Sequence, residues 1–148
     1  MKDRIVLVYD VGTQSSRALL INQRGEILAK SQVKHEVPYE SPYPDWAEKD
    51  ADFYYDNICR ASQDLKANHP DLFEKIEAAS ITTIRDTVVC VDSDGHPLRP
   101  AILWLDKRKA EGKPNLSQIT RLLFKAVGME ETANVQYQKS HCNWIRQN

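Results

Sequence analysis

A polar stretch between two apolar, strand-forming runs constrains this chain more than any other feature. Residues 9–20 read YDVGTQSSRALL and separate the run of residues 4–9 from the run of residues 17–22. A hairpin turn needs only about two to five polar residues. The stretch has more hydrogen-bonding groups than a chain reversal requires, so a ligand is one explanation. The other is an ordinary turn, in which Asp10 and Ser15 satisfy nearby backbone groups.

The chemistry of this stretch suits an anion. Gly12 lets the backbone approach a ligand closely, and the hydroxyl groups of Thr13, Ser15 and Ser16 can donate hydrogen bonds. Successive backbone N–H groups in a tight turn also form a concave anion site. The expected ligand group is therefore a phosphate.

Two charged residues near the turn extend this hypothesis. Asp10 ends the first run, where its carboxylate can hold a magnesium ion through the water shell, because Mg²⁺ prefers few carboxylates together with phosphate oxygens. Arg17 can balance the charge of a transferring phosphoryl group. Both residues are therefore candidates for a nucleotide site.

The runs around the turn predict a meander of three antiparallel strands. The continuous β-branched run of residues 4–9 predicts a strand buried on both faces, residues 17–22 predict the second strand, and residues 27–37 predict a third, partly exposed strand. Residues 23–26 are typical of a hairpin turn. Residues 39–50 are expected to be irregular because they contain two prolines.

Helices and strands are expected to alternate after this point. A helix begins near Asp50 or Asp52 and ends at residues 68–70, and Pro70 can begin a short helix. The later expected elements are a strand at residues 79–84, a hairpin at residues 87–104, a helix at residues 115–128 and a helix beginning at Ser140. With 148 residues, this order predicts one α/β domain. It resembles the ribonuclease-H-like arrangement of actin, sugar kinases and certain nucleases.

Charge and composition argue against several classes of protein. Lys and Arg number 20 and Asp and Glu 21, so broad attraction to nucleic acid or membrane is not expected. No apolar run approaches the ~20 residues that span a bilayer, and the start lacks a secretory signal. The three cysteines lack metal-ligand spacing, which favours a reduced, cytoplasmic compartment. The histidines also lack ligand spacing and are expected at the surface or in loops (His35, His69, His96 and His141).

Several motifs in the same order resemble the FGGY carbohydrate kinases, the family of glycerol kinase, xylulokinase and ribulokinase. DVGTQSSRALL resembles their opening phosphate loop, an Asp-x-Gly-Thr-x-Ser-x-Arg pattern between the first two strands. Further resemblances are DWAEKD at residues 45–50, ITTIRDTVV at 81–89, DGHPLRPAILWLDKR at 94–108 and SHCNWIRQN at 140–148. The resemblance therefore extends over essentially the whole chain.

The resemblance implies a fold, a reaction and its cofactors. The fold is α/β and ribonuclease-H-like, of the actin/hexokinase ATPase type, and the reaction is phosphorylation of a sugar or polyol by ATP with Mg²⁺. Gln14 departs from the Thr of glycerol kinase, but its amide also donates hydrogen bonds. The residues implied to bind the nucleotide are Asp10, Gly12, Thr13, Gln14, Ser15 and Arg17, with Asp10 beside the magnesium ion.

Five residues are implied at the sugar site or near its rim. Arg85 can donate hydrogen bonds to the hydroxyl groups of a polyol, and Asp86 can accept them. Asp86 is shorter than the Glu that glycerol kinase has here, which puts glycerol itself in question as the substrate. Trp104 can offer a flat face to a sugar, with Asp106 and Arg108 near the rim of the pocket. The alternatives are a surface ion pair for Arg85 and Asp86 and a core position for Trp104.

The resemblance also predicts what the chain lacks. The general base of these kinases lies on a Gly-Asp segment that would come after Asn148, and their second domain is absent, so no catalytic residue is assigned here. We therefore expect an N-terminal part of the family's N-terminal domain, inactive alone, with a tendency to self-associate through exposed apolar surface. The alternatives are a nuclease of the Holliday-junction-resolvase type and a non-catalytic module that binds nucleotide or sugar.

Overall fold

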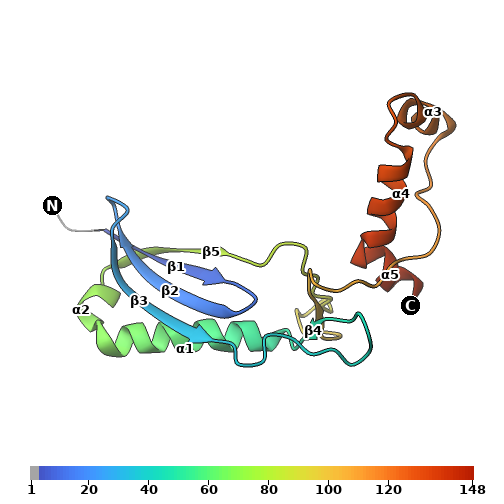
Figure 1. Ribbon diagram of the computed structural model, residues 1–148. Helices are drawn as coiled ribbons and strands as arrows, with labels where there is room; N and C mark the ends of the chain where they lie inside the picture. The colour runs from blue at the N-terminus through green and yellow to red at the C-terminus, as the bar shows by residue number, and fades with distance from the viewer. Residues whose placement is uncertain (1–3) are drawn as a thin grey trace. The chain divides into compact units, whose positions relative to one another are not determined.

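The computed structural model describes residues 4–148 and divides them into two compact units. The first contains residues 4–40 and 48–104, and the second contains residues 41–47 and 105–148 (Figure 1). The sequence predicted one domain without an internal boundary. Most hydrogen bonds of residues 105–148 lie within that segment or reach residues 41–47, so the second unit has an organisation of its own.

A sheet of four strands forms the centre of the first unit. Its strands are β1 (Ile5–Val11), β2 (Ser15–Asn22), β3 (Ile27–Lys34) and β5 (Ile76–Thr82), in the order β3-β2-β1-β5. The first three are antiparallel neighbours, which confirms the predicted meander, and β5 runs parallel to β1. Gly25 at the tip of the β2–β3 turn has a φ of 80°, a conformation that favours glycine.

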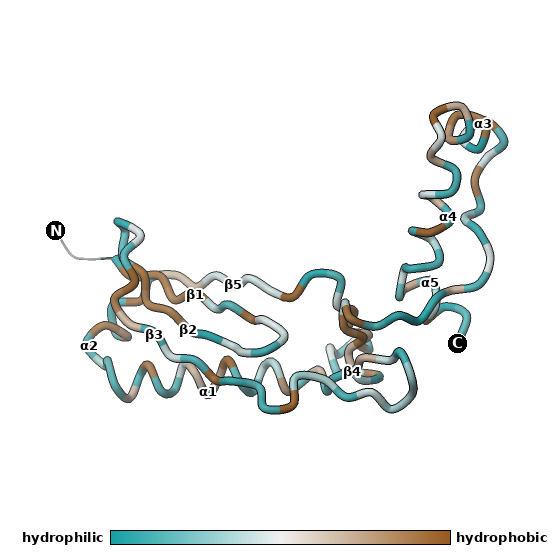
Figure 2. The backbone as a smooth tube through the Cα atoms, viewed as in Figure 1, coloured by the Kyte–Doolittle hydropathy of each residue, from teal (hydrophilic) through white to brown (hydrophobic). Residues whose placement is uncertain are grey.

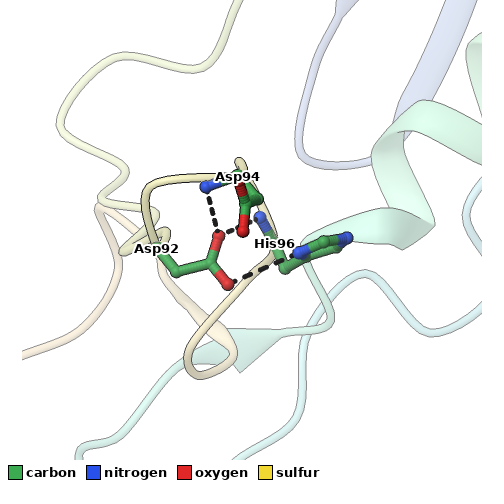
Figure 3. A group of neighbouring side chains, drawn as sticks. All are labelled: Asp92, Asp94 and His96. Carbon is green, nitrogen blue, oxygen red and sulfur yellow. Dashed lines mark hydrogen bonds and ion pairs between the residues drawn. The ribbon is translucent and has the colours of Figure 1, made fainter.

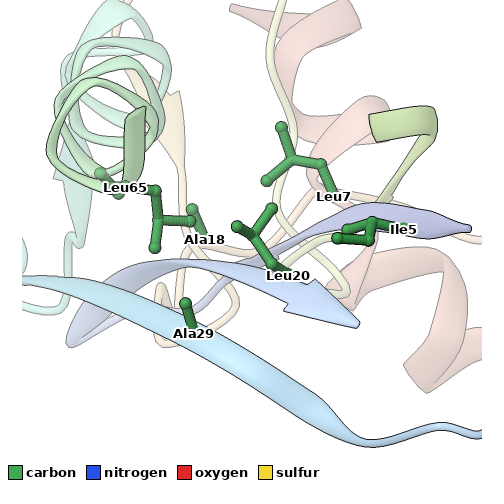
Figure 4. Packing of buried hydrophobic residues seen from close by; sticks show 7 residues of the cluster. Ile5, Leu7, Ala18, Leu20, Ala29 and Leu65 are labelled. Atoms are coloured by element: carbon green, nitrogen blue, oxygen red, sulfur yellow. The ribbon is translucent and has the colours of Figure 1, made fainter. Parts of the chain in front are cut away.

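One face of this sheet packs against helix α1 (Asp52–Asn68). Figure 4 shows the buried cluster, and Figure 2 shows how apolar residues gather along β1 and β2. In β1 the buried Ile5 and Leu7 alternate with the half-buried Val6 and Val8, so the prediction of a strand buried on both faces was wrong. The cluster consists of Ile5, Leu7, Ala18, Leu20, Ala29, Ala61 and Leu65.

The ends of α1 largely follow the sequence signals. The helix ends at Asn68 and α2 (Pro70–Phe73) begins at the predicted proline. At the start, Asp50 accepts a hydrogen bond from the backbone N–H of Asp52 (3.1 Å), while the capping position itself is Ala51. A hydrogen bond of 2.8 Å between the hydroxyl groups of Tyr9 and Ser62 joins the helix to β1.

The rest of the first unit is built from short pieces. Strand β4 (Glu48–Lys49) pairs antiparallel with β6 (Ala101–Ile102). The predicted hairpin at residues 87–104 is present as isolated bridges between Val88 and Ile102 and between Val91 and Pro97. Strand β5 begins three residues before the predicted position, at Ile76 rather than residue 79.

The second unit contains three helices, α3 (Gln118–Ala126), α4 (Glu130–Lys139) and α5 (His141–Gln147). Ser117 caps α3 by accepting a hydrogen bond from the backbone N–H of Thr120 (3.1 Å). The sequence predicted α3 and α5 but missed α4, whose residues EETANVQYQK lack an apolar stripe. Each helix in residues 4–148 is too short or too polar to cross a bilayer.

Several apolar side chains of the second unit are exposed, mainly on and after α3. They are Ile119, Leu122, Leu123, Val127 and Met129. Exposed apolar surface of this kind favours association. The self-association expected from the sequence stays a prediction.

Candidate functional site

The sheet register gathers three candidate residues on one face. Asp10 lies opposite Arg17 in the β1–β2 ladder, and Ser15 is two residues before Arg17, so all three side chains point to the same side. Ala18 and Leu20 have the opposite parity and lie in the cluster that packs against α1. The candidate site therefore lies on the face of the sheet that α1 does not cover.

Asp10 and Arg17 form an ion pair on this face. Nη1 of Arg17 donates to Oδ2 of Asp10 at 2.5 Å, and both side chains are partly exposed. Within residues 4–148, Oδ1 of Asp10 has no recorded hydrogen bond or ion pair. An exposed pair of this kind contributes at most about 1 kcal/mol to stability. Both groups can therefore exchange partners when a charged ligand binds.

Three carbonyl groups in and after the turn, those of Thr13, Gln14 and Ser15, are used internally. The Ser15 carbonyl accepts from the backbone N–H of Gly12 (3.0 Å), and the Gln14 carbonyl accepts from the backbone N–H of His35 (2.9 Å). The Thr13 carbonyl accepts from Nδ1 of the His35 ring (2.9 Å). Within residues 4–148, no acceptor is recorded for the backbone N–H groups of Thr13 and Gln14. A turn in which these three carbonyls are bound and two amides are available can accept an anion.

Close packing of the backbone at this turn favours glycine at position 12. A Cβ atom at this position would lie 3.3 Å from the Ser15 carbonyl oxygen, which is tighter than ordinary contact. The neighbouring Ser15 is itself buried, while Thr13 is half-buried and Gln14 is exposed. The backbone of the turn is therefore more accessible to a ligand than the Ser15 hydroxyl.

One sequence expectation for this turn was wrong, and another was met only in part. Ser16 was a candidate phosphate ligand, but it lies on the α1 face, fully buried, with its hydroxyl 3.0 Å from Nε2 of His35. His35 was expected at the surface or in a loop; it lies in the loop after β3, but it is only 7% exposed and contacts the rings of Phe53 and Tyr54 edge-on. The alternation of β3 could have indicated this, since Val33 and His35 have the same parity.

Arg85 and Asp86 follow the end of β5. Because β5 is parallel to β1, the carboxyl ends of both strands lie at the same edge of the sheet, which is also where the turn after β1 lies. Both side chains are exposed. Asp86 has a φ of 55°, a conformation that is uncommon outside glycine and often marks functional positions.

Trp104 makes a direct contact with the same turn. Its indole Nε1 donates to the Thr13 hydroxyl at 3.0 Å, and the residue is 53% exposed. A core position for Trp104 is therefore wrong. The Thr13 hydroxyl, which accepts this bond, still has its own proton to donate to a ligand.

Asp106 and Arg108 do not have the rim position that was expected. Both belong to the second unit and are buried, and the Asp106 side chain is 0% exposed. The Asp106 carboxylate accepts from the backbone N–H of Ala47 (2.7 Å) and from Nε and Nη2 of Arg108 (2.8 and 2.7 Å). The Arg108 guanidinium lies over the rings of Trp46 and Trp144. These contacts make Asp106 a structural residue.

The pKa of Asp106 reflects these contacts. Burial on its own raises the pKa of this carboxyl, but the hydrogen bonds from Arg108 and from the Ala47 backbone outweigh burial and hold the pKa below its usual value. The folded second unit therefore stabilises the ionised form of Asp106.

A group of potential metal ligands lies at the tip of the 87–104 hairpin. Figure 3 shows Asp92, Asp94 and His96, whose ligand atoms lie within 4.8 Å of one another. Oδ1 of Asp92 already accepts from the backbone N–H groups of Asp94 and His96, both at 2.9 Å. The bond from the His96 backbone is the main reason that the pKa of Asp92 is lowered. The group therefore forms a turn within the predicted hairpin of residues 87–104.

Comparisons with known proteins agree on one family. The family model described as "FGGY family of carbohydrate kinases, N-terminal domain" matches residues 5–148. A glycerol kinase of Herminiimonas arsenicoxydans is 37% identical over 125 residues, which are 78% of this chain and 24% of that protein. The chain therefore spans about a quarter of the length of this curated relative.

Solved structures show the same likeness in three dimensions. A xylulose kinase from Rhodospirillum rubrum superposes with a TM-score of 0.64 and 30% identity, over 71% of this chain and 21% of that one. A Plasmodium falciparum glycerol kinase solved with ADP superposes with a TM-score of 0.57 and 23% identity, over 85% and 23%, which shows the fold alone. These similarities confirm the α/β fold of the actin/hexokinase type and lend no support to the nuclease alternative.

Proposed function

Because the chain belongs to the FGGY family of carbohydrate kinases, we propose that its β1–β2 turn holds the phosphates of ATP during transfer to a sugar or polyol hydroxyl. The observation that carries this proposal is the polarity of the turn. The carbonyls of Thr13, Gln14 and Ser15 are bound internally, and the N–H groups of Thr13 and Gln14 have no acceptor within residues 4–148. Backbone amides of this kind bind phosphate oxygens well.

The side chains around the turn fit a magnesium nucleotide. Asp10 has one carboxylate oxygen engaged by Arg17 and one without a recorded partner in the described chain, which suits a carboxylate that contacts a hydrated Mg²⁺. When bound, the ion would neutralise phosphate charge. Arg17 lies on the same face and can donate to the transferring phosphoryl group. Thr13, Gln14 and Ser15 stay candidates for contacts with the other phosphates.

The sugar would be bound by residues at the same edge of the sheet. Trp104 offers an exposed indole face to the C–H groups of a sugar, while its N–H is bound to Thr13. Arg85 and Asp86 are both exposed, so Arg85 can donate a hydrogen bond to one sugar hydroxyl and Asp86 can accept one from its neighbour. Asp106 is left out of this proposal because its carboxylate is enclosed.

Arg17→Ala tests the nucleotide site. We expect the affinity for MgATP to fall about tenfold and the affinity for MgADP to fall less, because the guanidinium is proposed to contact the terminal phosphate. Isothermal titration calorimetry with both nucleotides measures this difference. Arg24→Ala is the control, since Arg24 is exposed and pairs with Glu26 in the β2–β3 turn, at the other end of β2. Equal loss in the two variants would contradict the proposed role of Arg17.

Turnover is expected to need a general base that this chain does not supply. The Asp10 carboxylate is proposed to contact Mg²⁺ and the Asp86 carboxylate to bind sugar hydroxyls, and the chain spans about a quarter of the length of its glycerol kinase relative. We therefore propose that the 148 residues bind nucleotide without phosphorylating a sugar. A coupled assay for ADP release with glycerol, xylulose and ribulose should give the same rate with and without sugar. ADP release that depends on sugar would contradict the proposed inactivity of the 148 residues, but it would not contradict phosphate binding by the β1–β2 turn.

A further inference from the structure

We propose that His35 is a positioning residue of the phosphate turn, which aims the Gln14 N–H at the ligand. This inference rests on the proposed function and adds a residue that the resemblance does not assign. His35 follows β3, outside the polar stretch, and touches the turn through three groups. Nδ1 lies 2.9 Å from the Thr13 carbonyl, the backbone N–H donates to the Gln14 carbonyl at 2.9 Å, and Nε2 lies 3.0 Å from the Ser16 hydroxyl.

The partners of the ring determine where its protons lie. A carbonyl oxygen only accepts hydrogen bonds, so the bond between His35 and Thr13 requires a proton on Nδ1. In the neutral ring, Nε2 then accepts from the Ser16 hydroxyl, which can rotate to suit. The ring is also held by edge contacts with Phe53 and Tyr54, at centroid distances of 4.8 and 6.0 Å. His35 therefore has little freedom to turn away.

Peptide geometry connects this bond to the ligand. A trans peptide is planar, so its C=O and N–H point in opposite directions. When His35 holds the Thr13 carbonyl, the N–H of the same peptide, which belongs to Gln14, must point away from His35. His35 lies on the α1 side with the buried Ser16, whereas Asp10 and Arg17 lie on the other face. The bond thus directs the Gln14 N–H away from the buried side of the turn.

Three variants separate this role from general support of the fold. His35→Phe keeps an aromatic ring against Phe53 and Tyr54 but removes both ring hydrogen bonds. His35→Asn keeps a donor close to the position of Nδ1. Ser16→Ala removes only the partner of Nε2 and leaves the bond to Thr13. A purely structural role predicts similar behaviour for His35→Phe and Ser16→Ala, whereas the proposal predicts that only His35→Phe disturbs the turn.

The experiment uses nuclear magnetic resonance of the ¹⁵N-labelled 148-residue chain, with MgADP as the probe. We expect a protonated Nδ1 in His35, a Gln14 amide that shifts on titration, an affinity about tenfold lower in His35→Phe, and near wild-type affinity in His35→Asn and Ser16→Ala. An unprotonated Nδ1, or equal losses in His35→Phe and Ser16→Ala, would overturn the proposal.

A failure of the proposed function gives a different result. If the wild-type chain does not respond to MgADP, phosphate binding by the turn is contradicted. The position of the His35 proton and the Gln14 amide shift in the ligand-free variants still decide the role of His35. A Gln14 amide that moves in His35→Phe and stays in place in His35→Asn and Ser16→Ala supports positioning. A Gln14 amide that is the same in all four proteins rejects it.

Discussion

Asp106→Ala is expected to lower the free energy of unfolding of the second unit by about 3–5 kcal/mol. The substitution removes a buried carboxylate that accepts from Nε and Nη2 of Arg108, whose side chain is 4% exposed, and it removes the acceptor of the Ala47 backbone N–H. Urea denaturation followed by tryptophan fluorescence measures the change. In a Trp104→Phe background, the two remaining tryptophans, Trp46 and Trp144, both lie in the second unit.

Lys107→Ala is the matched control for this prediction. Lys107 forms an ion pair with Asp45 at 3.5 Å in the same unit, but both side chains are largely exposed. Its removal should cost less than about 1 kcal/mol. If Asp106→Ala and Lys107→Ala lowered the free energy of unfolding equally, the buried Asp106–Arg108 pair would contribute no more to stability than the exposed pair.

The lowered pKa of Asp106 adds a pH dependence to the same comparison. The folded-state pKa lies below the unfolded value of about 3.8, so the unfolded state binds the proton more tightly. The contribution of the carboxylate is therefore complete above that value and is lost as the pH falls through the folded-state pKa. Asp106→Ala should remove this part of the acid destabilisation. If the free energy of unfolding fell equally with decreasing pH in the wild type and in Asp106→Ala, the lowered pKa of Asp106 would be contradicted.

Leu65→Ala is expected to lower the free energy of unfolding of the first unit by about 2–5 kcal/mol. Leu65 is 1% exposed and belongs to the cluster between α1 and the sheet (Figure 4). The shorter side chain loses the transfer free energy of the removed atoms and leaves a cavity, because the surrounding strands relax only in part. Native-state hydrogen exchange of the β1 and β2 amides reports this free energy for the first unit alone.

Leu98→Ala makes the same chemical change at an exposed position of the first unit. Leu98 is 68% exposed, so its truncation should alter the free energy of unfolding by no more than about 0.5 kcal/mol. If both variants exchanged their β1 amides at wild-type rates, the cluster around Leu65 would not be the core that holds α1 to the sheet.

Local signals in the sequence located most of the fold. The three-stranded meander, the end of α1 before Pro70 and a helix within residues 115–128 were predictable, because turns, prolines and short apolar patterns act over a few residues. Helix α4 was missed because its sequence has no apolar stripe, so only packing and the acidic first turn indicate a helix.

The candidate site divides in the same way. Gly12 and its polar neighbours marked the turn because their chemistry is local. The position of Trp104 beside the turn depends on a contact with Thr13 across 91 residues, and the enclosure of Asp106 depends on Ala47, 59 residues away. Spacing along the chain contains no information on such pairs.

By itself the sequence determined that a polar, glycine-containing turn joins two strands, since backbone freedom, strand propensity and hydrogen-bonding capacity belong to the residues themselves. Only the tertiary structure decided which side chains lie on each face of the sheet beside this turn. Register places Asp10 and Arg17 on the open face and Ser16 on the α1 face, and the end of β3 brings His35 to the turn. The physical reason is that neighbouring residues in a strand point to opposite sides, so their surroundings follow from what packs on each face.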